Sequence, residues 1–185
     1  MTTLTTKPIK DPLMLPRKQP ALNDSLPEEL ERLIASSGVD WTEKLINRCE
    51  YRFNPIPVVP FNSSTYQKLI YWSKILQDSL KPAEPEQILA ILARLRIHFT
   101  SQMMNENENE ILVHDYLADL SHFPFDLILQ AYNEYRYEGS NTFFPRVGQL
   151  RQMINIHLCK RLSKLNRLTA LIEVSERNAN TSQKQ

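Results

Sequence analysis

The residues of this sequence best suited to chemistry are histidines and carboxylates between positions 106 and 122. His114, Asp115 and Asp119 could offer metal ligands close to helical spacing. His122 follows eight residues after His114. A metal site on a helix needs two ligands four residues apart on one face and a third group that converges on them. His114 and Asp119 lie five residues apart, so the sequence predicts surface or capping side chains and no metal site.

Patterns typical of catalysis are missing from the sequence. The chain has 3 glycines, and none of them builds a glycine-rich loop that could cradle a phosphate. No serine or cysteine stands in a nucleophile-elbow pattern. The carboxylates of 106–119 lie in a polar turn and on a helix whose other face is apolar, which is typical of a solvated surface. We expect a protein that is not an enzyme and that needs no cofactor.

The charge distribution is the stronger functional signal. Residues 101–138 carry eight acids against Arg136 alone, a balance of −7, whereas 141–172 carry six basic residues and no acid, in a chain of net charge +1. The basic half of the last helical pattern combines Lys160, Arg161, Lys164 and Arg167 with Leu158, Leu162, Leu165 and Leu168. Such a helix could lie along phosphates, enter the apolar groove of a partner, pair with its own copy, or fold back on its acidic neighbours.

The segment that precedes this helix allows a DNA-binding interpretation. Arginine and glutamine suit base edges, which makes candidate nucleic-acid contacts of Arg146, Arg151, Lys160 and Arg167. Two adjacent aromatic residues stand directly before Arg146, and they are too apolar to be left in water. We therefore expect a structural motif that anchors the start of the last helix, formed by Phe143, Phe144, Pro145 and Leu150.

The elements that position these residues are predicted to be helices. Apolar residues recur at helical spacing between prolines, as in the stripes Leu69, Trp72, Leu76, Leu80 and Ile88, Leu92, Leu95, Phe99. No useful length of sequence alternates with period two, so no sheet is expected. With 42% hydrophobic residues, the chain can bury a core. The predicted fold is all-α, a compact bundle of about six to seven helices with a long C-terminal helix.

Four segments follow from this pattern. Residues 1–24 are rich in proline and are expected to be a disordered tail. Residues 25–155 should form the helical domain, including a helix from Asp40 to about Tyr51. A last helix of about 28 residues would be about 42 Å long, more than the domain needs. Its second half, 156–177, should therefore protrude as a basic amphipathic helix, followed by a disordered tail at 178–185.

The cysteines and the chain's hydropathy suggest the compartment. Cys49 and Cys159 are far apart and lie in amphipathic helical patterns, which predicts buried free thiols in a reducing compartment. No apolar stretch follows a basic start, and no window approaches 18 uninterrupted apolar residues. We expect a cytoplasmic protein that does not span a membrane.

A third of the chain resembles a known family. The resemblance lies in Asp115-Tyr116-Leu117-Ala118-Asp119-Leu120, Phe123-Pro124, Ala131 with Tyr132 and Tyr135, and Phe143-Phe144-Pro145-Arg146-Val147-Gly148-Gln149-Leu150. These stretches resemble small helical proteins of phage replication modules, and the nearest named group is the phage replicative-helicase loader/inhibitor family. Gln149-Leu150 stands where an acidic residue followed by an apolar one is typical of that family.

The resemblance implies a non-enzymatic adaptor that binds a hexameric DnaB-type replicative helicase, delivers it to the origin and restrains its ATPase. In that family a mobile C-terminal segment engages the helicase. The corresponding partner-binding residues here would be Leu158, Arg161, Leu162, Lys164, Leu165 and Leu168. Two alternatives stay open, a DNA-binding regulator that uses the basic 141–172 segment and a homodimer formed through 154–172. DNA or a replication initiator is a further possible partner.

Overall fold

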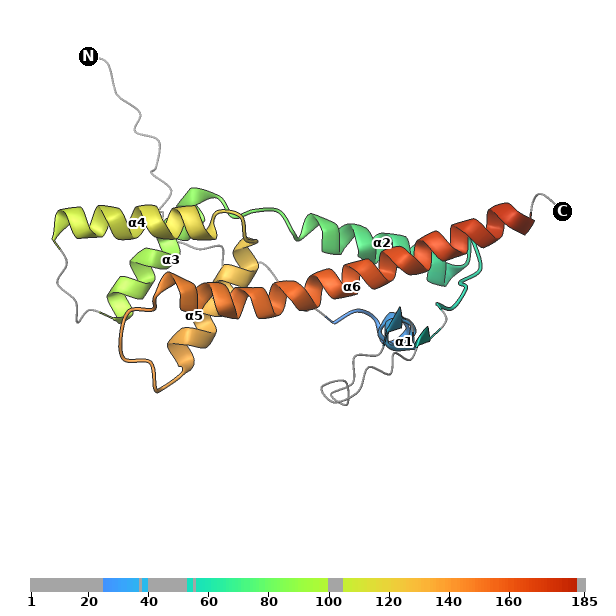
Figure 1. Cartoon of the computed structure of the whole chain (residues 1–185), viewed down its shortest axis with the longest axis horizontal. Helices are drawn as coiled ribbons and strands as arrows, with labels where there is room; N and C mark the ends of the chain where they lie inside the picture. Colours follow the sequence, from blue (N-terminus) through green and yellow to red (C-terminus); the bar gives the residue numbers. More distant parts are fainter. Residues whose placement is uncertain (1–24, 37, 40–52, 55, 100–104, 183–185) are drawn as a thin grey trace, which may run out of the picture. The chain divides into compact units, whose positions relative to one another are not determined.

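The computed structural model of the chain describes residues 25–36, 38–39, 53–54, 56–99 and 105–182, and the described part is helical (Figure 1). Its helices are α1 (Glu28–Ser36), α2 (Ser64–Asp78), α3 (Pro85–His98), α4 (Glu106–Leu120), α5 (Phe125–Tyr137) and α6 (Val147–Ser182). Two short strands, β1 (Gly38–Val39) and β2 (Phe53–Asn54), pair antiparallel, Gly38 opposite Asn54. The predicted all-α fold with a long last helix is confirmed. The predicted N-terminal tail at 1–24 and the helix from Asp40 to Tyr51 lie outside the described residues.

The chain divides into two compact units, and the boundary falls inside α6. The first unit takes in Pro82–Asn155, and the second takes in Leu22–Lys81 together with Ile156–Gln185. This differs from the predicted single domain over 25–155, because α1 and α2 belong to the same unit as the second half of α6.

In the first unit, α3 packs against both α4 and α5. Capping boxes start two of these helices. Glu84, just before α3, pairs with Gln87 in its first turn, and Asn105, just before α4, pairs with Glu108 in its first turn. The link between α3 and α5 is fixed by the backbone N–H of Ala83, which donates to the carbonyl of Phe123 at 2.9 Å. Each helix buries an apolar face, and the fully buried side chains include Ile88, Ile91, Leu95, Leu120, Leu127, Ile128, Leu150 and Ile154.

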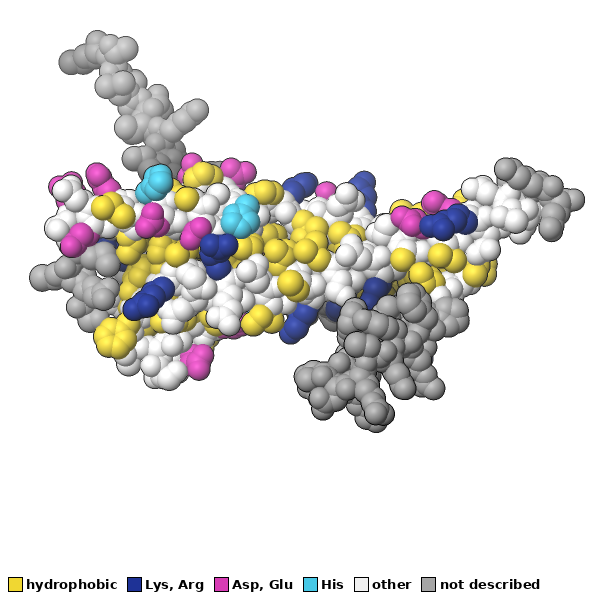
Figure 2. All heavy atoms as spheres, viewed as in Figure 1, with side chains coloured by type: hydrophobic (Ala, Val, Ile, Leu, Met, Phe, Trp, Pro, Cys, Tyr) yellow, Lys and Arg dark blue, Asp and Glu magenta, His cyan; other side chains and the backbone are white. Residues whose placement is uncertain are grey.

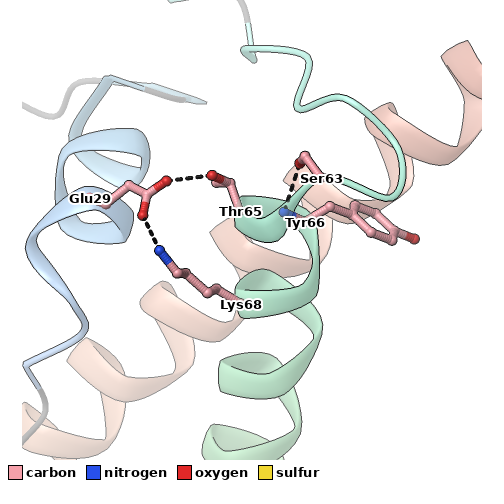
Figure 3. Close-up of polar contacts among 5 residues, drawn as sticks. All are labelled: Glu29, Ser63, Thr65, Tyr66 and Lys68. Atoms are coloured by element: carbon pink, nitrogen blue, oxygen red, sulfur yellow. Dashed lines mark hydrogen bonds and ion pairs between the residues drawn. The ribbon is translucent and has the colours of Figure 1, made fainter.

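In the second unit, α1, α2 and the C-terminal part of α6 share one apolar cluster, which contains Leu26, Leu30, Ile34, Val59, Tyr66, Leu69, Leu76, Leu168 and Leu171. Polar contacts join α1 to α2 at the cluster's edge (Figure 3). Glu29 of α1 accepts a hydrogen bond from the Thr65 hydroxyl, and its other carboxylate oxygen lies 2.6 Å from Lys68 Nζ. Ser63 caps α2, since its Oγ accepts the Tyr66 N–H at 3.1 Å. These contacts fix α1 on α2.

Two predictions about the last helix need correction. The helix continues to Ser182, so residues 178–182 of the predicted disordered tail are helical, and 183–185 lie outside the described residues. The stretch 156–177 does not protrude, because Leu168 and Leu171 are fully buried in the cluster of the second unit. Ser175 on the same helix face is also buried, and its Oγ accepts the Val59 N–H at 3.1 Å. The apolar face of α6 is buried because α1 and α2 cover it in the second unit.

Candidate functional site

A groove of about 750 Å³ lies in the first unit, between α4 and the loop that joins α5 to α6. One wall is a single face of α4, because its lining residues Glu108, Ile111, Leu112 and Asp115 follow the i, i+3, i+4, i+7 spacing. The other wall is the loop over 140–147. This loop contains Phe143-Phe144-Pro145-Arg146, which includes most of the predicted anchor of the last helix.

Two phenols hold the loop wall in place. The Tyr116 hydroxyl, from α4, donates a buried hydrogen bond to the carbonyl of Pro145. The Tyr135 hydroxyl, from α5, donates to the carbonyl of Phe143 at 3.2 Å. The Phe144 ring packs edge-on against Tyr116, with 5.8 Å between the ring centroids. The backbone of the loop is therefore fixed from both neighbouring helices.

Burial affects the protonation of both phenols. Burial, and to a smaller extent the neighbouring Tyr135 phenol, raises the pKa of Tyr116 well above its ordinary value. Burial and the nearby Glu138 carboxylate raise the pKa of Tyr135 as well. A phenol with a raised pKa stays protonated at neutral pH and stays a hydrogen-bond donor. The contacts that shape the loop wall therefore do not depend on physiological changes of pH.

The predicted anchor at the start of α6 is placed in part as expected. Pro145 and Leu150 are buried, and Phe144 is half-buried against Tyr116. Phe143 differs, because its side chain is 66% exposed while only its backbone carbonyl is held by Tyr135. The anchor therefore consists of Phe144, Pro145 and Leu150. The Phe143 ring lies at the rim of the groove and faces water.

Across the groove, α4 presents a second exposed apolar side chain, Ile111, which is 63% exposed. The sequence contained a signal for it. Val113, Tyr116, Leu117 and Leu120 follow helical spacing on one apolar face of α4, and Ile111 falls outside that face. Ile111 was therefore not among the residues predicted from the sequence, although it lines the groove.

The rim of the groove is strongly charged on the α4 side. The sequence of α4 contains five acids and no lysine or arginine. Figure 2 shows acidic side chains gathered over α4 with apolar surface beside them. Glu108 and Asp115 belong to the groove wall itself, and Arg146 lies on the loop side. The lining of the groove thus combines apolar side chains with two carboxylates and, among the described lining residues, a single basic side chain.

The candidate nucleic-acid contacts are divided between the two units. In the first unit Arg146 is exposed at the groove, and Arg151 pairs with Asp119 at 3.3 Å. In the second unit Lys160 is exposed, whereas the guanidinium of Arg167 donates to the carbonyl of Ile34 at 3.2 Å. Arg151 and Arg167 thus each hold a partner within their own unit.

Most of the predicted partner-binding residues pack within the second unit. Leu168 is fully buried, and Leu165 packs against the same cluster. Arg161 is 1% exposed, and its Nη1 donates to the carbonyl of Ser79 at the C-terminal end of α2, where a cation suits the helix dipole. Arg161 and Leu168 therefore serve the fold, which corrects their prediction as surface contacts.

The other three predicted residues differ in exposure. Lys164 pairs with Glu31 of α1 at 2.7 Å. Leu158 is half-buried and Leu162 is exposed. Among the predicted residues, Leu162 is thus the one that is exposed and to which the described contacts give no structural role.

The described residues also bear on the chemistry expected from the sequence. Within them, no group of three or more His, Cys, Asp or Glu side chains is placed to hold a metal ion. Cys159 is a free thiol but is exposed, which corrects the predicted buried thiol, and Cys49 lies outside the described residues. No helix in this part of the chain is long and apolar enough to cross a bilayer.

Comparisons of the chain with protein families, with curated proteins and with solved structures find no significant match.

Proposed function

We propose that this protein is a non-enzymatic accessory protein of phage DNA replication that binds a DnaB-type replicative helicase in the host cytoplasm, as its loader or inhibitor. One observation carries the proposal. Most of the segment Phe143–Leu150, which is part of the resemblance to the helicase loader/inhibitor family, lines a groove with exposed apolar side chains on both walls, Phe143 and Ile111.

The energetics of these two side chains support docking of another protein. Fully burying a large apolar side chain from water is worth roughly 1.5 to 3 kcal/mol, and Ile111 and Phe143 are each about two-thirds exposed, so a partner that covers both gains about 2 to 4 kcal/mol. A micromolar complex requires about 8 kcal/mol. The groove supplies part of this free energy but not all of it, so the partner is expected to touch further surface. Leu162 in the second unit is a candidate for that additional contact.

The two alternatives have less support. A DNA-binding regulator would need the arginines of 141–172 to be available for phosphates, and Arg151 and Arg167 are engaged within their own units. A homodimer through 154–172 would need the leucine stripe, and Leu168 is buried in the cluster of the second unit. Duplex DNA binding and the mass of the protein in solution remain useful control measurements.

The test is binding of the full chain to the purified host helicase hexamer, measured by biolayer interferometry. We expect the double variant Ile111→Ser, Phe143→Ser to lose about 30-fold or more in affinity, because two central apolar contacts are removed. The matched control is Ile97→Ser, Leu89→Ser, which removes two exposed apolar side chains of α3 in the same unit and outside the groove. Thermal melting of each variant by circular dichroism checks that it folds.

Two results would overturn the proposal. One is a lack of binding between the unaltered protein and the helicase at micromolar concentration. The other is an equal loss of affinity in the groove variant and in the α3 control. The helicase ATPase rate, measured with and without the protein, then tests whether binding restrains the helicase, in which case the rate falls.

A further inference from the structure

We infer that the groove between α4 and the 140–147 loop receives a short amphipathic helix of the partner that carries lysine or arginine beside its apolar face. This inference deepens the proposed function, on which it rests for the identity of the partner.

The backbone around the groove favours a helical occupant over an extended one. An extended peptide gains affinity by pairing its own N–H and C=O groups with a neighbouring backbone. The α4 wall is a helix, whose backbone groups are already paired. In the loop wall, the carbonyls of Phe143 and Pro145 accept from Tyr135 and Tyr116, and the Arg146 N–H donates to Gln149 Oε1 at 2.8 Å. A helix brings its own backbone hydrogen bonds and needs none from these walls.

The length of the wall sets the length of the contact. From Glu108 to Asp115 the helix rises by about 10 Å, which is two helical turns. Two turns of a helical occupant present two or three apolar side chains on one face, at i, i+3 or i+4, and i+7. Ile111 and Phe143, on opposite walls, are the exposed apolar side chains against which that face would pack.

The charges on the α4 wall determine which charge the occupant should carry. Glu108 and Asp115 stand at the two ends of the α4 wall, and the Asp115 side chain is 64% exposed. One oxygen of Glu108 accepts the backbone N–H of Asn105 at 2.9 Å, and a carboxylate has further acceptor positions for a partner. The remaining acids of α4 extend the same field. A cationic edge on the occupant complements this wall, whereas an acidic edge would be repelled.

The first experiment measures fluorescence anisotropy with two labelled synthetic peptides of about 15 residues, the length at which an isolated helix begins to hold in water. Both peptides carry the same leucine face. One carries lysines at its edges, and the other carries glutamates at those positions. We expect the lysine peptide to bind the full chain at least about tenfold more tightly, and Ile111→Ser, Phe143→Ser to weaken its binding about 30-fold.

Matched charge variants separate the groove from the bulk charge of α4. Asp115→Asn and Glu110→Gln each remove one negative charge from α4, but Asp115 lines the groove and Glu110 does not. We expect Asp115→Asn to weaken the lysine peptide several-fold and Glu110→Gln to leave it nearly unchanged. Equal effects of the two variants, or equal binding of the two peptides, would overturn the inference.

A second experiment uses the helicase itself. A photoreactive amino acid at position 111 of the full chain is cross-linked to the purified hexamer, and mass spectrometry locates the attached segment. A cationic amphipathic helix at the cross-link supports the inference. An acidic or extended segment, a second copy of this chain, or its own residues 1–24 would overturn it. If the lysine peptide binds the groove while the helicase does not bind at all, the proposed helicase partner fails and the inferred occupant class stands.

Discussion

At the scale of single residues, the side chains that shape the groove differ from those that line it. Tyr116 reaches from the buried face of α4 to the Pro145 carbonyl, and its position is set by the core. Phe143 and Ile111 do little for the fold, because most of each side chain faces water. Arg161 shows the reverse case, because its charge was expected to serve a partner but its side chain is buried against the end of α2. Residue type alone does not separate these roles.

Replacement of Tyr116 tests the link between core and groove. Tyr116→Phe removes the hydroxyl and leaves the Pro145 carbonyl buried without this donor, which should lower the free energy of unfolding by about 1 to 2 kcal/mol. Chemical denaturation measures the change. Because the pKa of Tyr116 is raised above its ordinary value, the loss should be the same from pH 6 to about pH 9. The control is Tyr71→Phe, since Tyr71 is largely exposed. A loss no larger than in this control would contradict the structural role given to the phenol.

At the scale of elements, the sequence predicted the helices well but not which helices pack against one another. Helical spacing and proline boundaries indicated α2 to α6 because these signals are local. Periodicity shows that one face of α6 is apolar but not what covers it. The contacts that decide this join residues distant in sequence, such as Lys164 and Glu31, which are 133 positions apart. The groove was not predicted from the sequence: Phe143 was expected to anchor the start of α6, and Ile111 on α4 was not singled out.

The junction of α1 with α2 should depend on pH. Hydrogen bonds from Lys68 and then from Thr65 hold the pKa of Glu29 below its ordinary value of 4.5. A carboxylate whose pKa is lower in the folded state stabilises the fold above the unfolded-state pKa, and that contribution is lost as the pH falls through the folded-state value. Glu29→Gln should therefore lower the melting temperature slightly at pH 7, and the difference from the parent should shrink as the pH falls through the folded-state pKa of Glu29.

The matched control for this junction is Glu28→Gln, since Glu28 pairs with Arg32 of its own helix. Melting curves at several pH values, recorded by circular dichroism in low salt, measure both variants. An exposed ion pair is screened by salt, so the difference between Glu29→Gln and the parent should shrink at high ionic strength. A difference that grows toward acid pH would contradict the direction of the pKa shift.

At the scale of the whole molecule, the first unit carries the candidate binding groove, and the second unit buries the C-terminal part of α6 in its core. The groove is formed by residues of the first unit alone, and the buried leucines of α6 after position 155 belong to the core of the second. If each unit is stabilised by its own core, damage to one should spare the properties of the other. The chain offers a convenient reporter, because both of its tryptophans, Trp41 and Trp72, fall within the sequence of the second unit.

Two leucine-to-alanine variants test this independence. Leu127 in the first unit and Leu168 in the second are both fully buried, and each truncation should cost about 2 to 5 kcal/mol. Leu168→Ala should shift the thermal transition seen by tryptophan fluorescence to lower temperature and leave binding of the lysine peptide unchanged at 25 °C. Leu127→Ala should leave the tryptophan transition in place and lower the temperature at which peptide binding is lost. If either variant shifts both signals together, the two units unfold as one, and the groove depends on the whole core.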